Sequence, residues 1–208
     1  LSGDVAPRIA QGWTHADAVQ TEVAEDTTAI VVVEKEGIFH RLVEDGADVS
    51  LGILLVTGCG MPDIATRSLL KVVVQQHPRL RVLALCDYNP YGMGIFCCYK
   101  YGSTTKSHHE STRLLLPMLM WVGLRPAQVT RQIYEAPDVA KGLHPYTARD
   151  ISRLQGLLNS GHVAEVYKQE LRNMGAHGYK CELEALFCRG LGYMTTFLEQ
   201  CLVTADYI

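Results

Sequence analysis

The chain has 208 residues, of which 48% are hydrophobic and 20% are charged, and its formal net charge is -3. These values are ordinary for one large or two small globular domains with a substantial core, and they give no global basic signal for nucleic acid, so a DNA partner must be met by a local patch. Seven cysteines without framework spacing argue against a disulfide-stabilised secreted fold, and no apolar run is long enough to span a membrane. We therefore expect no membrane partner.

Residues 1–27 are mixed and polar, with scattered glycine and proline. This composition predicts a linker or the remnant of a missing N-terminal domain, and it is distinct from the segment 28–208 that follows. Because the chain begins with Leu1 rather than with methionine, we expect it to be a fragment.

Short apolar runs alternate with helical patterns up to residue 102. Buried strands are predicted at 29–33, 53–56 and 81–85, and helices at 37–45, 63–76 and 91–102. The strands lack polar alternation, which is typical of strands buried on both faces of a parallel sheet. We therefore predict an α/β fold with its ligand site at the carboxyl ends of the strands.

The second half of the chain is predicted to be a mostly helical extension. Residues 112–126 are apolar but are broken by Pro117 and Gly123. Thr147 is expected to cap a helix over 147–160. The residues expected to face the core of this extension are Ile151, Leu154, Leu157, Leu158, Leu183, Leu186, Phe187, Leu191, Met194, Phe197, Leu198 and Cys201.

Polar groups follow the three predicted strands. Glu34 follows the first, a loop from Gly58 to Asp63 follows the second, and Asp87 and Asn89 follow the third. A few oxygen ligands open to water suit Mg²⁺, which would neutralise phosphate and stabilise a developing alkoxide. The alternative is that these residues only cap the helices that follow.

Glycine and basic residues around these strand ends favour a phosphate ligand. Gly58 and Gly60 leave backbone N–H groups bare just before a helix, where an anion approaches closely. The alternative for each basic side chain is a solvated surface charge. The basic residues in or near these segments are Lys35, Arg67, Lys71, Lys100, Lys106 and Arg113.

Several stretches, in order, resemble one family. They are VVVEKEGIFHRL (31–42), TGCGMPDIATR (57–67), ALCDYNPYG (84–92), YKYGS (99–103), LLLPMLMWVGLRPAQV (114–129) and HPYTARDISRLQGLL (144–158). They are similar to the motifs of the meiotic double-strand-break protein, the sporulation-protein-eleven family, and of the A subunit of topoisomerase VI. The resemblance implies a Toprim fold, a parallel sheet flanked by helices, over about residues 28–205.

The resemblance also implies a Mg²⁺ site. By position, the metal ligands would be Glu34, Asp87 and Asn89, and Glu34 would be a possible acid or base. The sequence departs from the family at Asn89, where a second aspartate is expected, and at Cys59, where relatives often have lysine. Both departures weaken the expected site. The residues that would bind DNA are Lys35, Gly58, Gly60, Met61, Arg67, Lys100 and Ser103.

The nucleophile that the resemblance implies is a tyrosine in an N-terminal winged-helix domain, and nothing before Glu34 resembles that domain. Tyr88 and Tyr91 flank the metal motif but are poorly placed for in-line attack, so packing or DNA contact is expected of them. The chain alone is therefore expected to be inactive, with no nucleophile of its own.

The implied activity is DNA cleavage of the type IIB topoisomerase kind, giving meiotic double-strand breaks with 5′-phosphotyrosyl ends. The implied partners are double-stranded DNA, a second copy of the chain and an ATPase-like B-type subunit. The implied location is the nucleus. Three alternatives stay open: a catalytically weakened DNA-binding paralogue, the A subunit of topoisomerase VI, and a Rossmann-like phosphohydrolase with Asp87 as nucleophile.

Overall fold

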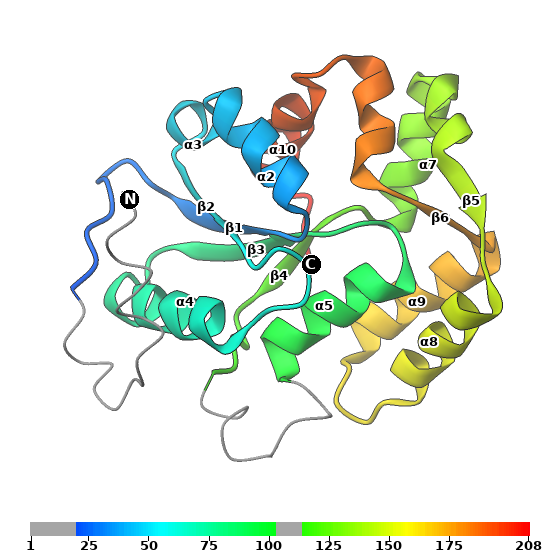
Figure 1. The fold of residues 1–208 in the computed structure, drawn as a ribbon, viewed down its shortest axis with the longest axis horizontal. Helices are drawn as coiled ribbons and strands as arrows, with labels where there is room; N and C mark the ends of the chain where they lie inside the picture. Colours follow the sequence, from blue (N-terminus) through cyan, green and yellow to red (C-terminus); the bar gives the residue numbers. More distant parts are fainter. Residues whose placement is uncertain (1–19, 103–113) are drawn as a thin grey trace.

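The computed structural model describes residues 20–102 and 114–208. Its centre is a four-stranded parallel sheet in the order β2-β1-β3-β4, with helices on both faces (Figure 1). The strands are β1 (Ala29–Val33), β2 (Ile53–Thr57), β3 (Arg81–Leu85) and β4 (Met120–Gly123). The predicted parallel α/β sheet is therefore confirmed, and the first three strands match their predicted bounds to within one residue.

The register brings the carboxyl ends of the central strands together. Val33 at the end of β1 is level with Thr57 of β2 and with Leu85 of β3. All five residues of β1 are buried, as expected for a central strand covered on both faces. The residues that follow these strands consequently emerge side by side at one edge of the sheet.

Helices pack on both faces of the sheet. In Figure 1, α2, α3 and α10 lie above the strands, and α4 and α5 lie below them. Asp63 caps α4 as predicted, since its side chain accepts a hydrogen bond from the Thr66 N–H. The bounds are α2 (Glu36–Glu44), α3 (Ala47–Ser50), α4 (Ile64–Gln76), α5 (Pro90–Tyr101) and α10 (Tyr193–Val203).

The C-terminal extension is helical, as predicted, but it also contains strands. Thr147 caps α8, and β5 pairs with β6 in an antiparallel ribbon. Neither this ribbon nor β4 was predicted, because a strand of three or four residues is too short to show a readable period. The remaining elements are α7 (Pro126–Glu135), η2 (Pro137–Gly142), β5 (Leu143–Pro145), α8 (Ala148–Asn159), α9 (Glu165–His177), β6 (Tyr179–Cys181) and η3 (Leu183–Arg189).

Two residues expected in the core of the extension are exposed. Ile151 lies on the outer side of α8, whereas Leu154 and Leu157 are buried as predicted. Leu191 is exposed because the apolar pattern of 182–202 is not one helix. A 3-10 helix and α10 are separated at Gly190–Gly192, and the break changes which side of the chain faces the core.

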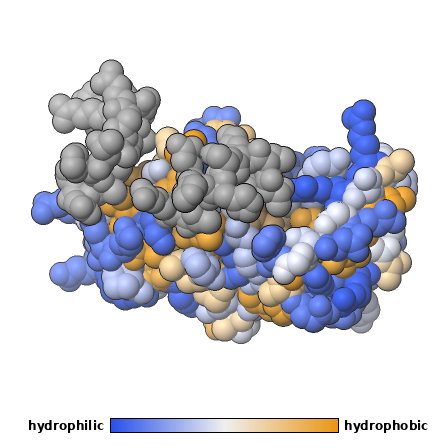
Figure 2. Space-filling view, turned by 90° about the horizontal axis from the view of Figure 1, so that it is seen from below, coloured by the Kyte–Doolittle hydropathy of each residue, from blue (hydrophilic) through white to orange (hydrophobic). Residues whose placement is uncertain are grey.

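The face that carries α4 and α5 is a mosaic of hydrophilic and hydrophobic residues where the structure describes it (Figure 2). Within the described residues, no helix has both the length and the hydropathy that a bilayer-crossing segment needs.

Candidate active site at the strand ends

The two acids predicted from the first and third strand ends lie together. Glu34 directly follows β1, and its N–H donates to the Leu85 carbonyl at the end of β3, with N···O 3.0 Å. The Asp87 N–H in turn donates to Glu34 Oε2, with N···O 2.9 Å. The parallel register and these two hydrogen bonds place both carboxylates at the same edge of the sheet.

Gly92, in the first turn of α5, leaves the space that this contact needs. A Cβ atom on this residue would lie 2.6 Å from the Asp87 carbonyl oxygen and 2.9 Å from Glu34 Oε2. Real Cβ atoms do not approach other atoms this closely. The glycine therefore allows the Glu34 side chain to reach the Asp87 N–H.

Glu34 is a carboxyl group whose charge is disfavoured. Burial and the neighbouring Asp87 carboxylate raise the pKa of Glu34 to about 7 from an ordinary value of 4.5. A carboxyl with this pKa exchanges a proton near neutral pH, and a cation bound beside it would favour the ionised form.

Asp87 is buried, and both of its carboxylate oxygens have partners. Oδ1 accepts from the Leu183 N–H at 2.9 Å, and Oδ2 lies 3.1 Å from Lys35 Nζ. Burial raises the pKa of Asp87, while the Leu183 N–H and the Lys35 ammonium act in the opposite direction. A cation, the Lys35 ammonium, thus already contacts Asp87, which is a predicted metal ligand.

Lys35 points into this acidic centre, where its ammonium contacts three acids. Besides Asp87, Lys35 Nζ lies 3.1 Å from Glu182 Oε2 and 2.8 Å from Glu184 Oε2. Burial lowers the pKa of Lys35, but the hydrogen bonds and charges of these acids outweigh it, so that the pKa is raised above the ordinary value. Its predicted contact with DNA stays a prediction.

Sequence reasoning missed Glu182 and Glu184. They reach the site because Tyr88, which lies between two of the predicted ligands, pairs with Cys181 of β6. The Tyr88 N–H donates to the Cys181 carbonyl with N···O 2.9 Å, and the Cys181 N–H donates to the Tyr88 carbonyl with N···O 3.0 Å. No local signal could have revealed this contact, because 93 residues separate Tyr88 from Cys181 (181 − 88 = 93).

Asn89 is the N-cap of α5 in this structure. Its Oδ1 accepts from the N–H groups of Tyr91 at 2.9 Å and of Gly92 at 2.8 Å. In the part of the chain that is described, no group of three or more His, Cys, Asp or Glu side chains is arranged to hold a metal ion. Asn89 thus caps α5, as the capping alternative expects, and metal ligation by Glu34, Asp87 and Asn89 stays a prediction.

The loop between β2 and α4 lies against Glu34. The Gly60 N–H donates to the Glu34 carbonyl at 2.8 Å, and Gly60 has a φ of +104°, a conformation that favours glycine. Gly58 faces the buried Tyr99 hydroxyl, which would lie 2.7 Å from a Cβ at this position. Met61 is exposed at the tip of the loop.

Three other basic residues predicted near the strand ends donate hydrogen bonds to main-chain carbonyls of this chain. Arg67 is only 4% exposed and donates to the Leu114 carbonyl. Lys71 donates to the Leu115 carbonyl, and Lys100 donates to the Pro117 and Leu119 carbonyls. These cations satisfy main-chain oxygens of a segment without regular structure, and their contact with DNA stays a prediction.

Lys100 is also distant from the acids along its helix. It is in the last turn of α5, about 15 Å from the Pro90 end at the usual rise per residue. Ser103, Lys106 and Arg113 lie outside the described residues.

The two tyrosines of the motif differ in exposure. Tyr88 is buried, and its hydroxyl lies 2.7 Å from His177 Nδ1. Burial is the main cause that raises the pKa of Tyr88. Tyr91 is partly exposed at the start of α5. The predicted packing role agrees with the position of Tyr88, whereas a DNA contact by Tyr91 is untested.

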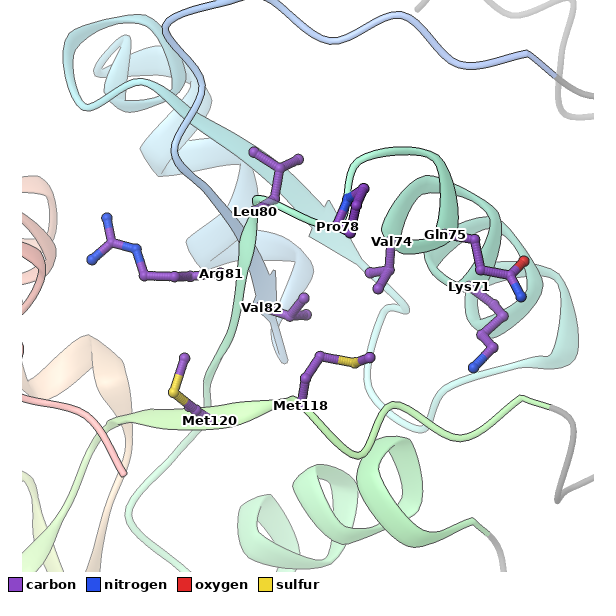
Figure 3. A pocket seen from close by; sticks show the side chains of 9 residues that line it. All are labelled: Lys71, Val74, Gln75, Pro78, Leu80, Arg81, Val82, Met118 and Met120. Carbon is purple, nitrogen blue, oxygen red and sulfur yellow. The ribbon is translucent and has the colours of Figure 1, made fainter.

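A pocket of about 300 Å³ lies elsewhere, between α4 and the starts of β3 and β4 (Figure 3). Leu80, Arg81 and Val82 form one wall, and Met118 and Met120 form another. Arg81 begins β3 and Asp87 follows its end, so about 20 Å of extended chain separate the pocket from the acids. The pocket is therefore not part of the candidate site.

The residues at the strand ends fit a divalent cation in their chemistry. Glu34 and Asp87 are adjoining carboxylates, and the structure shows a cation, the Lys35 ammonium, already bound to Asp87. Hard cations prefer such oxygen ligands. The donor set is therefore compatible with a hard cation, and a metal ion at this edge of the sheet stays a prediction.

Comparison with known proteins identifies the fold family. The family described as the Toprim domain of Spo11 and of the topoisomerase 6 A subunit matches residues 29–202. Meiotic recombination protein SPO11-2 of Oryza sativa subsp. indica is 35% identical over 185 residues, which are 89% of this chain and 46% of that protein. Meiotic recombination protein SPO11 of Mus musculus is 32% identical over 193 residues, which are 91% of this chain and 45% of that protein.

The A subunit of DNA topoisomerase 6 from Arabidopsis thaliana is similarly related, with 32% identity over 176 residues, which are 84% of this chain and 40% of that protein. The chain thus spans less than half the length of these relatives. The family match covers both the parallel sheet and the C-terminal extension, which confirms the predicted Toprim fold. This chain belongs to the family of Spo11 and the topoisomerase 6 A subunit, and it contains the Toprim domain of that family.

Proposed function

We propose that this chain is the core of a Mg²⁺-dependent, topoisomerase-like DNA transesterase that makes meiotic double-strand breaks. The observation that carries the proposal is the contact of Glu34 Oε2 with the Asp87 N–H at adjoining strand ends. Membership of the family and the names of the relatives, which include meiotic recombination proteins, support the same function.

The proposed metal ligands are Glu34 and Asp87, which approach one another from β1 and β3. A divalent cation at this place would neutralise the charge of a backbone phosphate and of the oxygen that leaves it. We do not propose Asn89 as a metal ligand, because its Oδ1 accepts hydrogen bonds from two N–H groups at the start of α5.

The proposed reaction exchanges one phosphorus–oxygen bond for another. A tyrosine oxygen bonds to phosphorus as the bond to the 3′ oxygen breaks, which leaves a 5′-phosphotyrosyl link and, after protonation, a 3′ hydroxyl. Without a bound cation the pKa of Glu34 is about 7; a cation favours the ionised form, in which Glu34 would accept a proton.

We assign the nucleophile to a tyrosine outside this chain. Tyr88 is buried and bonded to His177, and Tyr91 stands at the start of the helix that Asn89 caps. The buried Tyr88 hydroxyl is not available for in-line attack on a phosphate bound at the acids, and we propose that Tyr91, inside the metal motif, is poorly placed for it. The chain alone is therefore proposed to bind DNA without cleaving it.

The proposed DNA-facing surface is the loop between β2 and α4. Gly60 lies against Glu34, since its N–H donates to the Glu34 carbonyl and is therefore not free for phosphate, and Met61 is the exposed side chain of the loop. A phosphate at this loop would lie beside the proposed metal. In the active form, we propose two copies of the chain on double-stranded DNA with an ATPase-like B-type subunit, in the nucleus.

A second candidate function is a DNA-binding paralogue with weakened catalysis. It is favoured by Asn89, which offers no negative charge and is used as a helix cap. A phosphohydrolase with Asp87 as nucleophile has less support, because both oxygens of this carboxylate already have partners.

Isothermal calorimetry with MgCl₂ and fluorescence anisotropy of a labelled duplex test the proposal. We expect wild-type chain to bind Mg²⁺ and to bind DNA more tightly with Mg²⁺ than with EDTA. Glu34→Gln and Asp87→Asn keep the side-chain shapes and should each weaken Mg²⁺ binding at least tenfold. Normal Mg²⁺ affinity in both variants would refute the assignment of the site.

The matched control is Glu165→Gln. Glu165 forms an exposed ion pair with Arg172 and begins α9, whose other end carries His177. It therefore lies about 18 Å along the helix from the residue that contacts Tyr88. We expect this variant to bind Mg²⁺ as the wild type does.

A further inference from the structure

The ammonium of Lys35 connects the most buried acid of the site to its two most exposed acids. The side chains of Asp87, Glu182 and Glu184 are 5%, 61% and 43% exposed, and that of Lys35 is 26% exposed. Lys35 Nζ is within 3.1 Å of an oxygen of each acid. The ammonium therefore lies between the interior of the site and solvent.

In this position, the Lys35 ammonium competes with any other cation for the Asp87 carboxylate. Oδ1 of Asp87 is held by the Leu183 N–H, and Oδ2 is held by the ammonium. Two cations that share one carboxylate repel each other, and in a partly buried place this repulsion is only weakly screened. When a metal ion binds to Asp87, the ammonium of Lys35 must either contact the same carboxylate as the metal ion or lose its contact with Asp87.

Glu182 and Glu184 offer the ammonium a second place. Without them, a Lys35 displaced from Asp87 would keep its charge near the metal ion with no partner, which is unfavourable in a partly desolvated site. With them, its hydrogen bond to Glu184 at 2.8 Å remains as the bond to Asp87 is released. The movement is directed toward solvent, because both acceptors are more exposed than Asp87.

We infer that Glu182 and Glu184 are positioning residues, which hold Lys35 and receive its ammonium from Asp87 when a divalent cation binds. The inference rests on the proposed metal site and assigns these acids no direct bond to the metal. Their connection to the site is structural, through the pairing of Cys181 with Tyr88 and the Leu183 N–H on Asp87.

Calorimetric Mg²⁺ binding in two backgrounds tests the inference. In the otherwise wild-type chain, the double substitution Glu182→Gln and Glu184→Gln should weaken Mg²⁺ binding about tenfold, which corresponds to about 1.4 kcal/mol. Both side chains are largely exposed, so the fold should tolerate the change, and a thermal melt checks it. The control Glu165→Gln should leave the affinity unchanged.

The second background is Lys35→Met, which removes the ammonium and keeps much of the aliphatic side chain. Here the same double substitution should change Mg²⁺ affinity less than about threefold, which is less than about 0.7 kcal/mol. A tenfold loss that persists without Lys35 would overturn the inference, because direct ligation or a general effect of charge would then explain it. Unchanged affinity of the double variant in the wild-type background would overturn it too.

Failure of the inference and failure of the proposed function are distinguishable. If the wild type binds no Mg²⁺, or if Asp87→Asn binds it normally, the proposed metal site is wrong and the inference falls with it. If Asp87→Asn loses binding while the Glu182 and Glu184 variant does not, the metal site stands and only the role of these two acids is refuted.

Discussion

Replacing Gly92 by alanine should destabilise the protein and weaken its site, although alanine usually favours a helix. A Cβ at this position would lie 2.6 Å from the Asp87 carbonyl oxygen, which belongs to the backbone, and 2.9 Å from Glu34 Oε2. Relief requires the loop after β3 to move or Glu34 to leave the Asp87 N–H. The substitution therefore acts directly on the contact that brings the two acids together.

The expected change in the free energy of unfolding of Gly92→Ala is the balance of a stabilising and a destabilising effect. Gly→Ala in an unhindered helix stabilises by about 0.5–1 kcal/mol. Overpacking costs about 1–3 kcal/mol, and losing a hydrogen bond to a charged group costs about 1.5–3 kcal/mol. We expect a net loss of about 2 kcal/mol, or about 4–8 °C in melting temperature for a domain of this size.

Gly156→Ala provides the matched control. Gly156 is in α8, and a Cβ there meets nothing within 4 Å. This variant should melt about 1–4 °C above the wild type, because only the helix preference changes. Differential scanning calorimetry measures both proteins, and calorimetric titration should show weaker Mg²⁺ binding for Gly92→Ala alone. A Gly92→Ala protein that melts and binds like the wild type would refute the crowding argument.

Three further predictions concern charge and hydrogen bonding. Because the pKa of Glu34 is raised from 4.5 to about 7, its stabilisation of the metal-free fold is complete below pH 4.5 and is lost as pH rises through 7. Mg²⁺ affinity should rise over the same interval, and Glu34→Gln should flatten both trends in melts and calorimetry; unchanged slopes would contradict the assigned pKa. Asn89→Asp keeps a good N-cap, so stability should change by less than about 0.5 kcal/mol while the added charge tightens Mg²⁺ binding; an unchanged affinity would show that position 89 does not act on the metal. Tyr88→Phe removes the hydroxyl bonded to His177 and should cost about 1 kcal/mol in urea unfolding. Tyr99→Phe should be nearly neutral, because the Tyr99 hydroxyl has no hydrogen-bond partner within the described residues, and equal losses for the two variants would be inconsistent with these contacts.

The sequence predicted the sheet well because its strands carry an unambiguous signal. The runs at 29–33 and 82–85 are apolar without polar alternation, Glu34 follows the first directly and Asp87 follows the second after one residue, and the structure has strands at 29–33 and 81–85. A parallel sheet then requires the ends of neighbouring strands to meet, which is why Glu34 and Asp87 could be paired from the sequence. The prediction used only local pattern and a rule of topology.

The same reasoning was less successful where a residue has two possible partners. Asn89 suits both a metal and a helix N-terminus, and only the structure shows its Oδ1 on the N–H groups of α5. Lys35 was assigned to DNA because it follows a predicted strand end and because of the family resemblance, and the sequence did not reveal the three acids that contact its ammonium. Two of those acids come from the last 27 residues of the chain, beyond the reach of any local pattern (208 − 182 + 1 = 27).

The pairing of Tyr88 with Cys181 has a consequence for the order in which the protein folds. The four sheet strands are complete by Gly123, but the Leu183 N–H that holds Asp87 comes 60 residues later (183 − 123 = 60). Contacts between distant residues form late because closing a long loop costs chain entropy. A nascent chain can therefore build its sheet before the environment of Asp87 exists. In pulse-labelled hydrogen exchange during refolding, we expect the Val31 amide to gain protection before the Leu183 amide.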